Sequence, residues 1–305
     1  MNFNLTYKSI SGFKFGLVLC SAFILGSVHI SYSSANSEMS SAEIFKPVAE
    51  KLVKQGVDSA FIYNLINDKN VKFDEGFVKI NVIGSGKAAD YSSHYNTRAV
   101  SKSKTFLEEN LAILQAAEDK YGVPKEVITS ILYVETRHGG YLGNNNIVSV
   151  FLSTALADQS IFIDMNSRTL KETYNNDSEE LDKYLTKLKD RAKYKTKWAM
   201  EQLVALEQLN KLSPVPITEI NGSWAGAFGM SQFLPSSYVS WAVDGNNDKV
   251  VNLFDKEDAI YSVGNYLNSN GWGKTDTKKR KAVWHYNHSN AYVDAVLKLS
   301  ELIAS

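Results

Sequence analysis

The residue of this 305-residue chain best suited to acid–base chemistry is Glu135. It lies near the end of residues 124–140, a segment that begins with proline and ends with two glycines, as helices often do. Glu135 follows Ile131 by four residues, so a helix places its carboxyl group on the apolar face. Burial and the negative end of the helix dipole both raise the pKa of such a group. The pattern predicts a general acid protonated near neutral pH, with a structural ion pair to Arg137 or Arg191 as the alternative.

A second segment, residues 221–238, alternates small residues with large aromatic and apolar ones. Its glycines allow a ligand to approach the backbone closely. Ser223 and Gln232 supply directional hydrogen bonds, and Trp224, Phe233 and Tyr238 supply flat apolar faces. Sugar rings need both kinds of contact, so the segment predicts a saccharide-binding surface. Tight helix packing, which also uses glycine and alanine, is the alternative.

Residues 244–255 place oxygen atoms at the spacing of a twelve-residue calcium loop. The predicted ligands are Asp244, Asn246, Asp248, Val250 through its main-chain carbonyl, Asn252 and Asp255. Two residues depart from the pattern, because Lys249 stands where the turn favours glycine and Asp255 where a longer glutamate binds. The alternative is a turn rich in Asp and Asn, in which Asp255 caps the following helix and Asp258 completes the capping signal.

The elements that must position these residues are mostly helices. Apolar periodicity and capping residues predict short helices at residues 41–55 and 58–67, a long helix at 97–121 and another from residue 124. Residues 178–212 are typical of two consecutive surface helices or one broken helix. One strand is predicted at residues 71–83, followed by a linker at 84–87. The sequence thus predicts a mainly α protein with little sheet.

The composition supports a packed globular protein. Hydrophobic residues make up 44% of the chain and charged residues 22%, with 33 basic against 33 acidic side chains. This neutral balance lacks the basic surface that nucleic-acid binding needs, so no nucleic-acid partner is expected. A single cysteine, Cys20, rules out a disulfide framework.

The first 35 residues have the features of a secretory signal peptide. Lys8 and Lys14 precede an apolar stretch at residues 15–28, and small residues at 33–35 suit a signal peptidase. The stretch has 14 residues, fewer than the roughly 20 that a spanning helix needs. We therefore expect export to the periplasm; an uncleaved N-terminus that associates weakly with the membrane is the alternative.

Three strings together resemble the lytic murein transglycosylases of the membrane-bound B type. They are Val134-Glu135-Thr136-Arg137-His138-Gly139, the stretch 225–238, and Tyr286-Asn287-His288-Ser289-Asn290-Ala291-Tyr292, in the same order as in the family. The resemblance covers roughly residues 97 to 303. It implies a lysozyme-like α+β catalytic domain at residues 97–305, preceded by a small N-terminal helical cap and linker at residues 36–96.

The resemblance also implies a chemistry for Glu135. Family members cleave the β-1,4 bond between N-acetylmuramic acid and N-acetylglucosamine in peptidoglycan without using water. The matching glutamate protonates the departing oxygen and then accepts the proton of the muramic acid C6 hydroxyl, which closes a 1,6-anhydro ring. One carboxyl group suffices, and no cofactor is required; calcium in residues 244–255 would be structural.

By the same resemblance, eight residues are expected to bind the substrate. They are Ser223, Gln232, Phe233, Tyr266, Tyr286, Asn287 and Tyr292, with Arg191 as the candidate for an expected arginine pair. The expected partners are peptidoglycan glycan strands, together with cell-wall assembly proteins. For the tyrosines, packing in the core or at the rim is the structural alternative.

Two segments depart from the family. Better-known members carry a small β lobe between the counterparts of Trp272 and Tyr286, where this chain has only about a dozen mostly basic residues. Residues 158–195, by contrast, are longer than their counterpart. Two other functions would use the same substrate-binding residues. One is a lysozyme-type hydrolase, which needs a positioned water molecule, and the other is a catalytically idle peptidoglycan-binding scaffold.

Overall fold

Helices dominate the protein. The computed structural model describes residues 39–83 and 90–305, so the predicted signal peptide at 1–35 and linker at 84–87 lie outside the described residues. Within the described part, the strands are β1 (Asn145–Asn146) and β2 (Asn221–Gly222), which form one two-stranded sheet. This confirms the prediction of a mainly α protein with little sheet.

Twelve α-helices and three short 3-10 helices follow one another along the described ranges. They are α1 (Ser41–Lys54), α2 (Ser59–Asn67), η1 (Glu75–Val78), η2 (Ser92–His94), α3 (Thr97–Glu109), α4 (Leu111–Tyr121), α5 (Lys125–Thr136), α6 (Ile147–Thr154), α7 (Ser160–Thr173), α8 (Ser178–Leu212), η3 (Ile217–Glu219), α9 (Pro235–Trp241), α10 (Lys256–Ser269), α11 (Asp276–Tyr286) and α12 (Asn290–Ala304). None of these helices is both long and apolar enough to cross a membrane.

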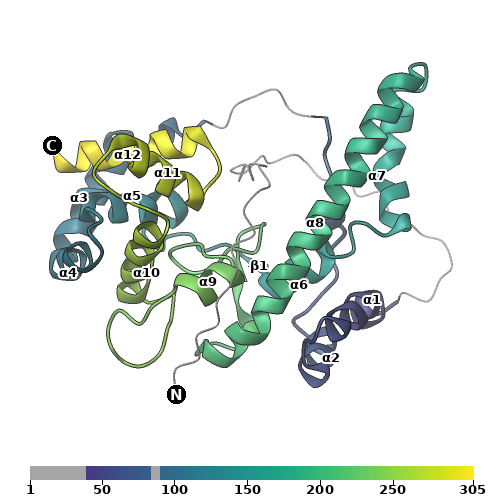
Figure 1. The fold of residues 1–305 in the computed structure, drawn as a ribbon, viewed down its shortest axis with the longest axis horizontal. Helices are drawn as coiled ribbons and strands as arrows, with labels where there is room; N and C mark the ends of the chain where they lie inside the picture. The colour runs from purple at the N-terminus through teal and green to yellow at the C-terminus, as the bar shows by residue number, and fades with distance from the viewer. Residues whose placement is uncertain (1–38, 84–89) are drawn as a thin grey trace.

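The helix that carries Glu135, α5, is at the centre of one group of helices. It packs against α3, α4, α10 and α12, and Figure 1 shows these helices gathered on one side with α11. Nine of its twelve residues are buried, including Ile128, Ile131 and Leu132. A helix that is apolar on nearly all sides must lie in the core, and this burial fixes the position of its last turn.

The two N-terminal helices form as the sequence predicts. Ser40 and Glu43 make a capping box at the start of α1, and Asp58 accepts a hydrogen bond from the backbone N–H of Phe61 at the start of α2. The apolar faces of both helices, including Phe45 and Ile62, join the same hydrophobic core as α5 and α6. The division between a cap and a catalytic domain at residue 97 stays a prediction.

The prediction of a strand at residues 71–83 is wrong. The segment contains η1 and otherwise runs along α6 and α7 without pairing to a strand. Its backbone N–H groups are satisfied by helix side chains instead: Lys72 donates to Ser149 Oγ (2.8 Å) and Ile80 donates to Asn166 Oδ1 (2.7 Å). The apolar alternation therefore marks an extended segment buried against helices, not a sheet.

Two helix predictions are also wrong in detail. The long helix expected at 97–121 is interrupted at Asn110, whose backbone leaves the helical conformation between α3 and α4. Residues 178–212, expected as two helices or a broken one, form the continuous 35-residue helix α8. Its charged N-terminal half is held by α7, and Leu170 and Leu188 meet there in a second apolar cluster. Figure 1 shows α7 and this half of α8 projecting as an arm.

The short sheet joins the two segments that carry the predicted chemistry. β1 follows α5, β2 lies in the second segment, and Asn145 pairs with Gly222 in antiparallel register. The two backbone segments approach so closely that a Cβ atom on Gly143, whose φ is 88°, would overlap the carbonyl oxygen of Gly222. Glycine is therefore required at this contact.

Candidate active site

Glu135 lies in the last turn of α5, as the sequence predicts. The helix ends at Arg137, which has a left-handed backbone with φ 57°, two residues before the glycines expected to end it. Thr136 fixes this end, because its hydroxyl donates to the carbonyl oxygen of Met230 (3.0 Å) and accepts from the N–H of Gly139 (2.9 Å). The end of α5 is thus bonded directly to the second chemistry-bearing segment.

Among the described residues, the carboxyl group of Glu135 has one polar side-chain partner, Tyr292 of α12. The Tyr292 hydroxyl donates to Glu135 Oε1 at 2.6 Å. Burial raises the pKa of Glu135 to about 7, and the hydrogen bond from Tyr292 opposes part of that rise. Glu135 remains partly exposed, so a ligand can reach it. Among the described residues it forms no ion pair, which excludes the salt bridge to Arg137 or Arg191.

Aromatic residues surround this hydrogen bond. The rings of Tyr286 and Tyr292 lie near-parallel at 11°, with centroids 6.4 Å apart. The Tyr286 hydroxyl donates to the Ser231 carbonyl oxygen (2.6 Å), and the Tyr266 hydroxyl donates to that of His285 (2.7 Å). Burial raises the pKa of all three tyrosines, and the charge of Glu135 raises the pKa of Tyr286 and Tyr292 further. These hydroxyls therefore stay protonated and act as hydrogen-bond donors.

Ser223 and Gln232 are partly exposed on the loop between β2 and α9. Ser223 Oγ accepts from the N–H of Ala227 (3.2 Å), which leaves its own hydroxyl proton able to donate. Gln232 has a left-handed backbone with φ 49°, and its amide donates to the carbonyl oxygens of Leu142 (3.3 Å) and Gly229 (3.0 Å). The loop is thus held in one shape, with polar atoms at its surface.

The structure brings most of the predicted substrate-binding residues together, but at different depths. Phe233, at 2% exposure, packs against Tyr266 and Tyr286 and supports their rings from behind. Asn287 is buried, and its Oδ1 atom has no hydrogen-bond partner among the described residues. Arg191 lies apart on the exposed side of α8, where it donates to the backbone carbonyl of Asn81.

Tyr91 and His94 also belong to this neighbourhood, although sequence reasoning placed them in a cap and linker. The Tyr91 ring meets that of Tyr292 edge-on at 6.0 Å, and His94 packs on Tyr91 at 5.2 Å. Burial, together with the nearby charge of Arg137, lowers the pKa of His94 to about 4, so the imidazole is neutral. No local pattern in the sequence indicates the contact between Tyr91 and Tyr292, because the two residues are far apart in the chain.

Comparison with known proteins identifies the family. The transglycosylase SLT domain family matches residues 40–282, which is most of the chain. The chain belongs to this family. The match begins in α1 and ends in α11, so it includes Glu135 and the loop that carries Ser223 and Gln232.

Individual relatives of this transglycosylase-domain protein agree with that assignment. The membrane-bound lytic murein transglycosylase B of Escherichia coli is 37% identical over 163 residues, 53% of this chain and 36% of the relative. The match thus spans about a third of that curated relative's length.

Solved structures share the fold at lower identity. The E. coli lytic transglycosylase SLT35, solved with bulgecin A and with calcium, has a TM-score of 0.64 at 21% identity, covering 87% of this chain and 92% of its own. Pseudomonas aeruginosa SltB3, in complex with NAG-anhNAM-pentapeptide, has a TM-score of 0.65 at 18% identity, covering 87% and 80%. The likeness confirms the mainly helical, lysozyme-like fold.

The loop at residues 244–255 forms the hydrogen bonds of the alternative interpretation. Asp244 accepts from the N–H groups of Asp248 (3.2 Å) and Lys249 (2.8 Å). Asp255 caps α10 by accepting from Glu257 and Asp258, and Asp258 in turn accepts from the N–H of Asn252 (2.6 Å). The described residues contain no group of three acidic, histidine or cysteine side chains arranged to hold a metal ion. The loop thus bonds its own backbone through these oxygens, and Lys249 adopts the left-handed turn with φ 73°.

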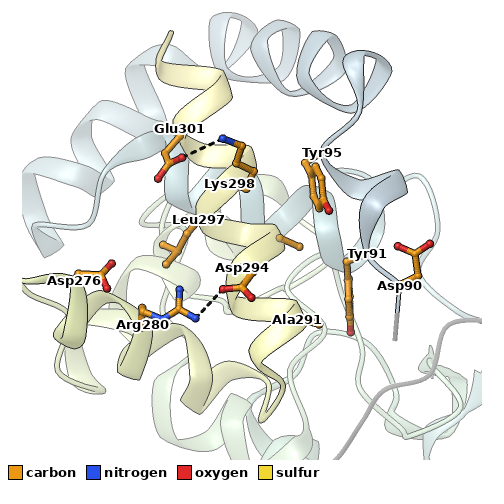
Figure 2. Close-up of a pocket in the computed structure, with 11 residues that line it drawn as sticks. Asp90, Tyr91, Tyr95, Asp276, Arg280, Ala291, Asp294, Leu297, Lys298 and Glu301 are labelled. Carbon is orange, nitrogen blue, oxygen red and sulfur yellow. Dashed lines mark hydrogen bonds and ion pairs between the residues drawn. The ribbon is translucent and has the colours of Figure 1, made fainter. Parts of the chain in front are cut away.

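A separate hollow lies between α11, α12 and the segment around η2 (Figure 2). It is lined by Asp90, Tyr91, Tyr95, Asp276, Arg280, Ala291, Asp294, Ala295, Leu297, Lys298 and Glu301. Glu135 is not among these residues. Arg280 pairs with Asp294 (2.7 Å) and Lys298 with Glu301 (3.6 Å), so much of the charge in the hollow is neutralised internally.

Proposed function

We propose that this protein is an exported lytic transglycosylase that cleaves peptidoglycan glycan strands, with Glu135 as both acid and base. The observation that carries the proposal is the state of Glu135: a reachable carboxyl group with a pKa of about 7, bonded to the neutral hydroxyl of Tyr292. Membership of the transglycosylase SLT domain family supports the same reaction.

The first step uses Glu135 as an acid. With a pKa of about 7, a large share of the molecules carry the proton at neutral pH. The proton passes to the oxygen that links muramic acid C1 to N-acetylglucosamine, and the electron pair of the breaking C1–O bond stays on that oxygen. This leaves a cationic sugar and a Glu135 carboxylate, which the Tyr292 hydroxyl stabilises through its hydrogen bond.

The second step uses the carboxylate as a base. It accepts the proton of the muramic acid C6 hydroxyl, whose oxygen bonds to C1 and closes the 1,6-anhydro ring. Glu135 is then protonated again, and no water enters the product. Because the substrate supplies the nucleophile, the second carboxylate of ordinary glycosidases is unnecessary.

The surroundings of Glu135 support a mechanism with a single carboxyl group. Its raised pKa is due to burial, opposed only by Tyr292. Asp158, another acid of the chain, lies near Lys51 instead, with 4.0 Å between Lys51 Nζ and Asp158 Oδ1. Among the described residues, no neighbouring carboxylate raises the pKa of Glu135 further.

We also propose that the predicted substrate-binding residues near Glu135 bind the glycan strand. Ser223 and Gln232 offer partly exposed hydrogen-bonding atoms, and Tyr286 offers a partly exposed ring beside Glu135. Asn287 lies deeper, with an unpartnered Oδ1 atom among the described residues. The relative SltB3 has been solved with NAG-anhNAM-pentapeptide, a sugar–peptide ligand of the expected class. Cell-wall assembly proteins stay a prediction.

Export and calcium are the remaining parts of the proposal. Export rests on residues 1–35, and N-terminal sequencing of the protein from the periplasm would show whether cleavage occurs near residue 35 or the segment is retained at the membrane. Asp255 caps α10 through its Oδ1 atom, so calcium binding by residues 244–255 would use its Oδ2 atom. Calorimetric titration of calcium into the metal-free protein tests this directly.

Digestion of purified peptidoglycan sacculi tests the proposed reaction. Mass analysis of the released fragments should find 1,6-anhydro-muramic ends, which are lighter than reducing ends by one water. Glu135→Gln should abolish release, because an amide cannot donate the proton, whereas the exposed Glu109→Gln should release as the wild type does. Reducing ends would indicate a hydrolase, and no release would indicate a scaffold.

A further inference from the structure

Trp224 is a large aromatic residue that folding leaves exposed. Its side chain is 56% exposed, although it lies directly after Ser223 in the proposed substrate loop. One part of the indole packs against the buried Phe77 of η1, with ring centroids 5.5 Å apart. The ring is therefore held in place and still presents apolar surface to solvent.

One cation of α8 lies beside this ring, and a second lies near the first. Lys195 Nζ is 5.4 Å from the centroid of the Trp224 ring, and Arg191 is one helical turn earlier on the same side of α8. Backbone carbonyls of the neighbouring extended segment orient both: Lys195 donates to that of Lys79 (3.3 Å) and Arg191 to that of Asn81. Three separate elements thus build the arrangement.

Neither cation has an acidic partner among the described residues. Glu75, two residues before Phe77, pairs with the side chain of Lys79 instead (3.2 Å). Burial lowers the pKa of Lys195, and the like charge of Arg191 lowers it further. A bound anion would relieve both effects, since a half-buried ammonium group without a counter-charge is unfavourable.

The exposed ring and the two cations suit a ligand that has both an apolar face and a negatively charged group. An indole face suits the apolar face of a sugar ring, and the fork of a guanidinium group with a nearby ammonium suits a carboxylate. Within the part of the chain that the structure describes, Arg191 makes one hydrogen bond, to the carbonyl of Asn81, which leaves other donors of its guanidinium group available. A neutral sugar alone would leave the cations unpaired.

We propose that Trp224, Lys195 and Arg191 form a subsite for the peptide stem of a glycan strand, with the sugar ring against Trp224 and a stem carboxylate between the two cations. This inference rests on the proposed function, because it assigns the part of the same substrate that extends beyond the scissile bond. The relative SltB3, solved with a sugar bearing a pentapeptide, supports the ligand class. The subsite makes the protein selective for strands that still carry their peptides.

Binding of two synthetic tetrasaccharides tests the subsite. One carries pentapeptide stems on its muramic acids, and in the other the lactyl groups end as neutral methyl amides. Calorimetry with Glu135→Gln, which cannot turn over, should give about tenfold tighter binding of the stem-bearing ligand, the size expected for hydrogen bonds between charged groups. The preference should shrink as sodium chloride is raised, because salt screens charges near the surface.

Further variants, made in the Glu135→Gln protein, show which residues cause the preference for the stem-bearing ligand. Lys195→Met and, separately, the exposed Arg191→Met should each remove most of it, whereas Lys195→Arg should retain it. Trp224→Ala should weaken both ligands. Lys193→Met is the matched control, because Lys193 is a nearby exposed cation of α8 with no contact to Trp224, and it should bind both ligands as before.

Two results would overturn the subsite: equal binding of the two ligands by Glu135→Gln, or an undiminished preference in both Lys195→Met and Arg191→Met. Either can occur while the wild-type protein releases anhydro ends from sacculi, in which case the proposed function survives alone. Failure to bind either ligand and to release any fragment would overturn both.

Discussion

Replacing Glu135 with glutamine should stabilise the fold in a way that depends on pH. The folded protein holds the carboxyl proton more tightly than the unfolded chain, because burial raises the pKa from 4.5 to about 7. For a carboxyl group with a raised pKa, stability is complete below about pH 4.5 and is lost as the pH rises towards 7. Glutamine removes that loss, since it carries no charge and still offers an oxygen to the Tyr292 hydroxyl.

The size of the effect follows from the two pKa values. The difference between 4.5 and about 7, at about 1.4 kcal/mol for each pH unit, corresponds to about 3 kcal/mol at pH 8 and to almost nothing at pH 4. For a chain of this length, about 3 kcal/mol raises the midpoint of thermal unfolding by roughly 5 °C.

Unfolding by urea and by heat, measured at pH 4 and pH 8, provides the assay. Glu135→Gln should match the wild type at pH 4 and exceed it at pH 8, while the exposed Glu109→Gln should match it at both. Equal stability of Glu135→Gln and wild type at pH 8, or an equal gain at both pH values, would refute the argument that the folded protein desolvates this carboxylate.

The remaining predictions concern pH dependence, backbone space and the calcium loop. Activity should fall as the pH rises through about 7, and Tyr292→Phe should move that limb of the pH–rate profile upward, because the hydrogen bond from Tyr292 lowers the pKa of Glu135. Gly143→Ala should lower the free energy of unfolding by several-fold more than Gly271→Ala, since both have positive φ but only Gly143 faces a backbone contact; equal losses in denaturant titrations would contradict this. Asp255→Ala should cost about 1 kcal/mol as a lost helix cap without calcium and more with calcium; an equal loss in both conditions would contradict calcium binding by Asp255.

The local features of this protein could be predicted from its sequence because they depend on residues close together in the chain. The capping box of Ser40 and Glu43 specifies the start of α1. The four-residue step from Ile131 to Glu135 specifies the face on which the carboxyl group lies, and the high pKa follows from that face. The mainly α class follows from the same periodicity.

Periodicity was insufficient where distant partners decide the outcome. The alternation at residues 71–83 suits a strand, but the hydrogen-bond acceptors that this segment meets are Ser149 and Asn166 on helices, so no sheet forms. The charged half of α8 has a weak apolar face and suggests a break, yet contact with α7 keeps it helical. In both cases the packing partner, which no local pattern contains, selects the structure.

The sequence by itself therefore determined that a carboxyl group would point inward at the end of a buried helix. Only the tertiary structure decided which side chains contact this carboxyl group. Tyr292, 157 residues away in the chain, donates a side-chain hydrogen bond to Glu135, and the same folding places Lys195 against the Trp224 ring. The physical reason is that pKa values and binding surfaces depend on distances in space, which a chain acquires only when its helices pack.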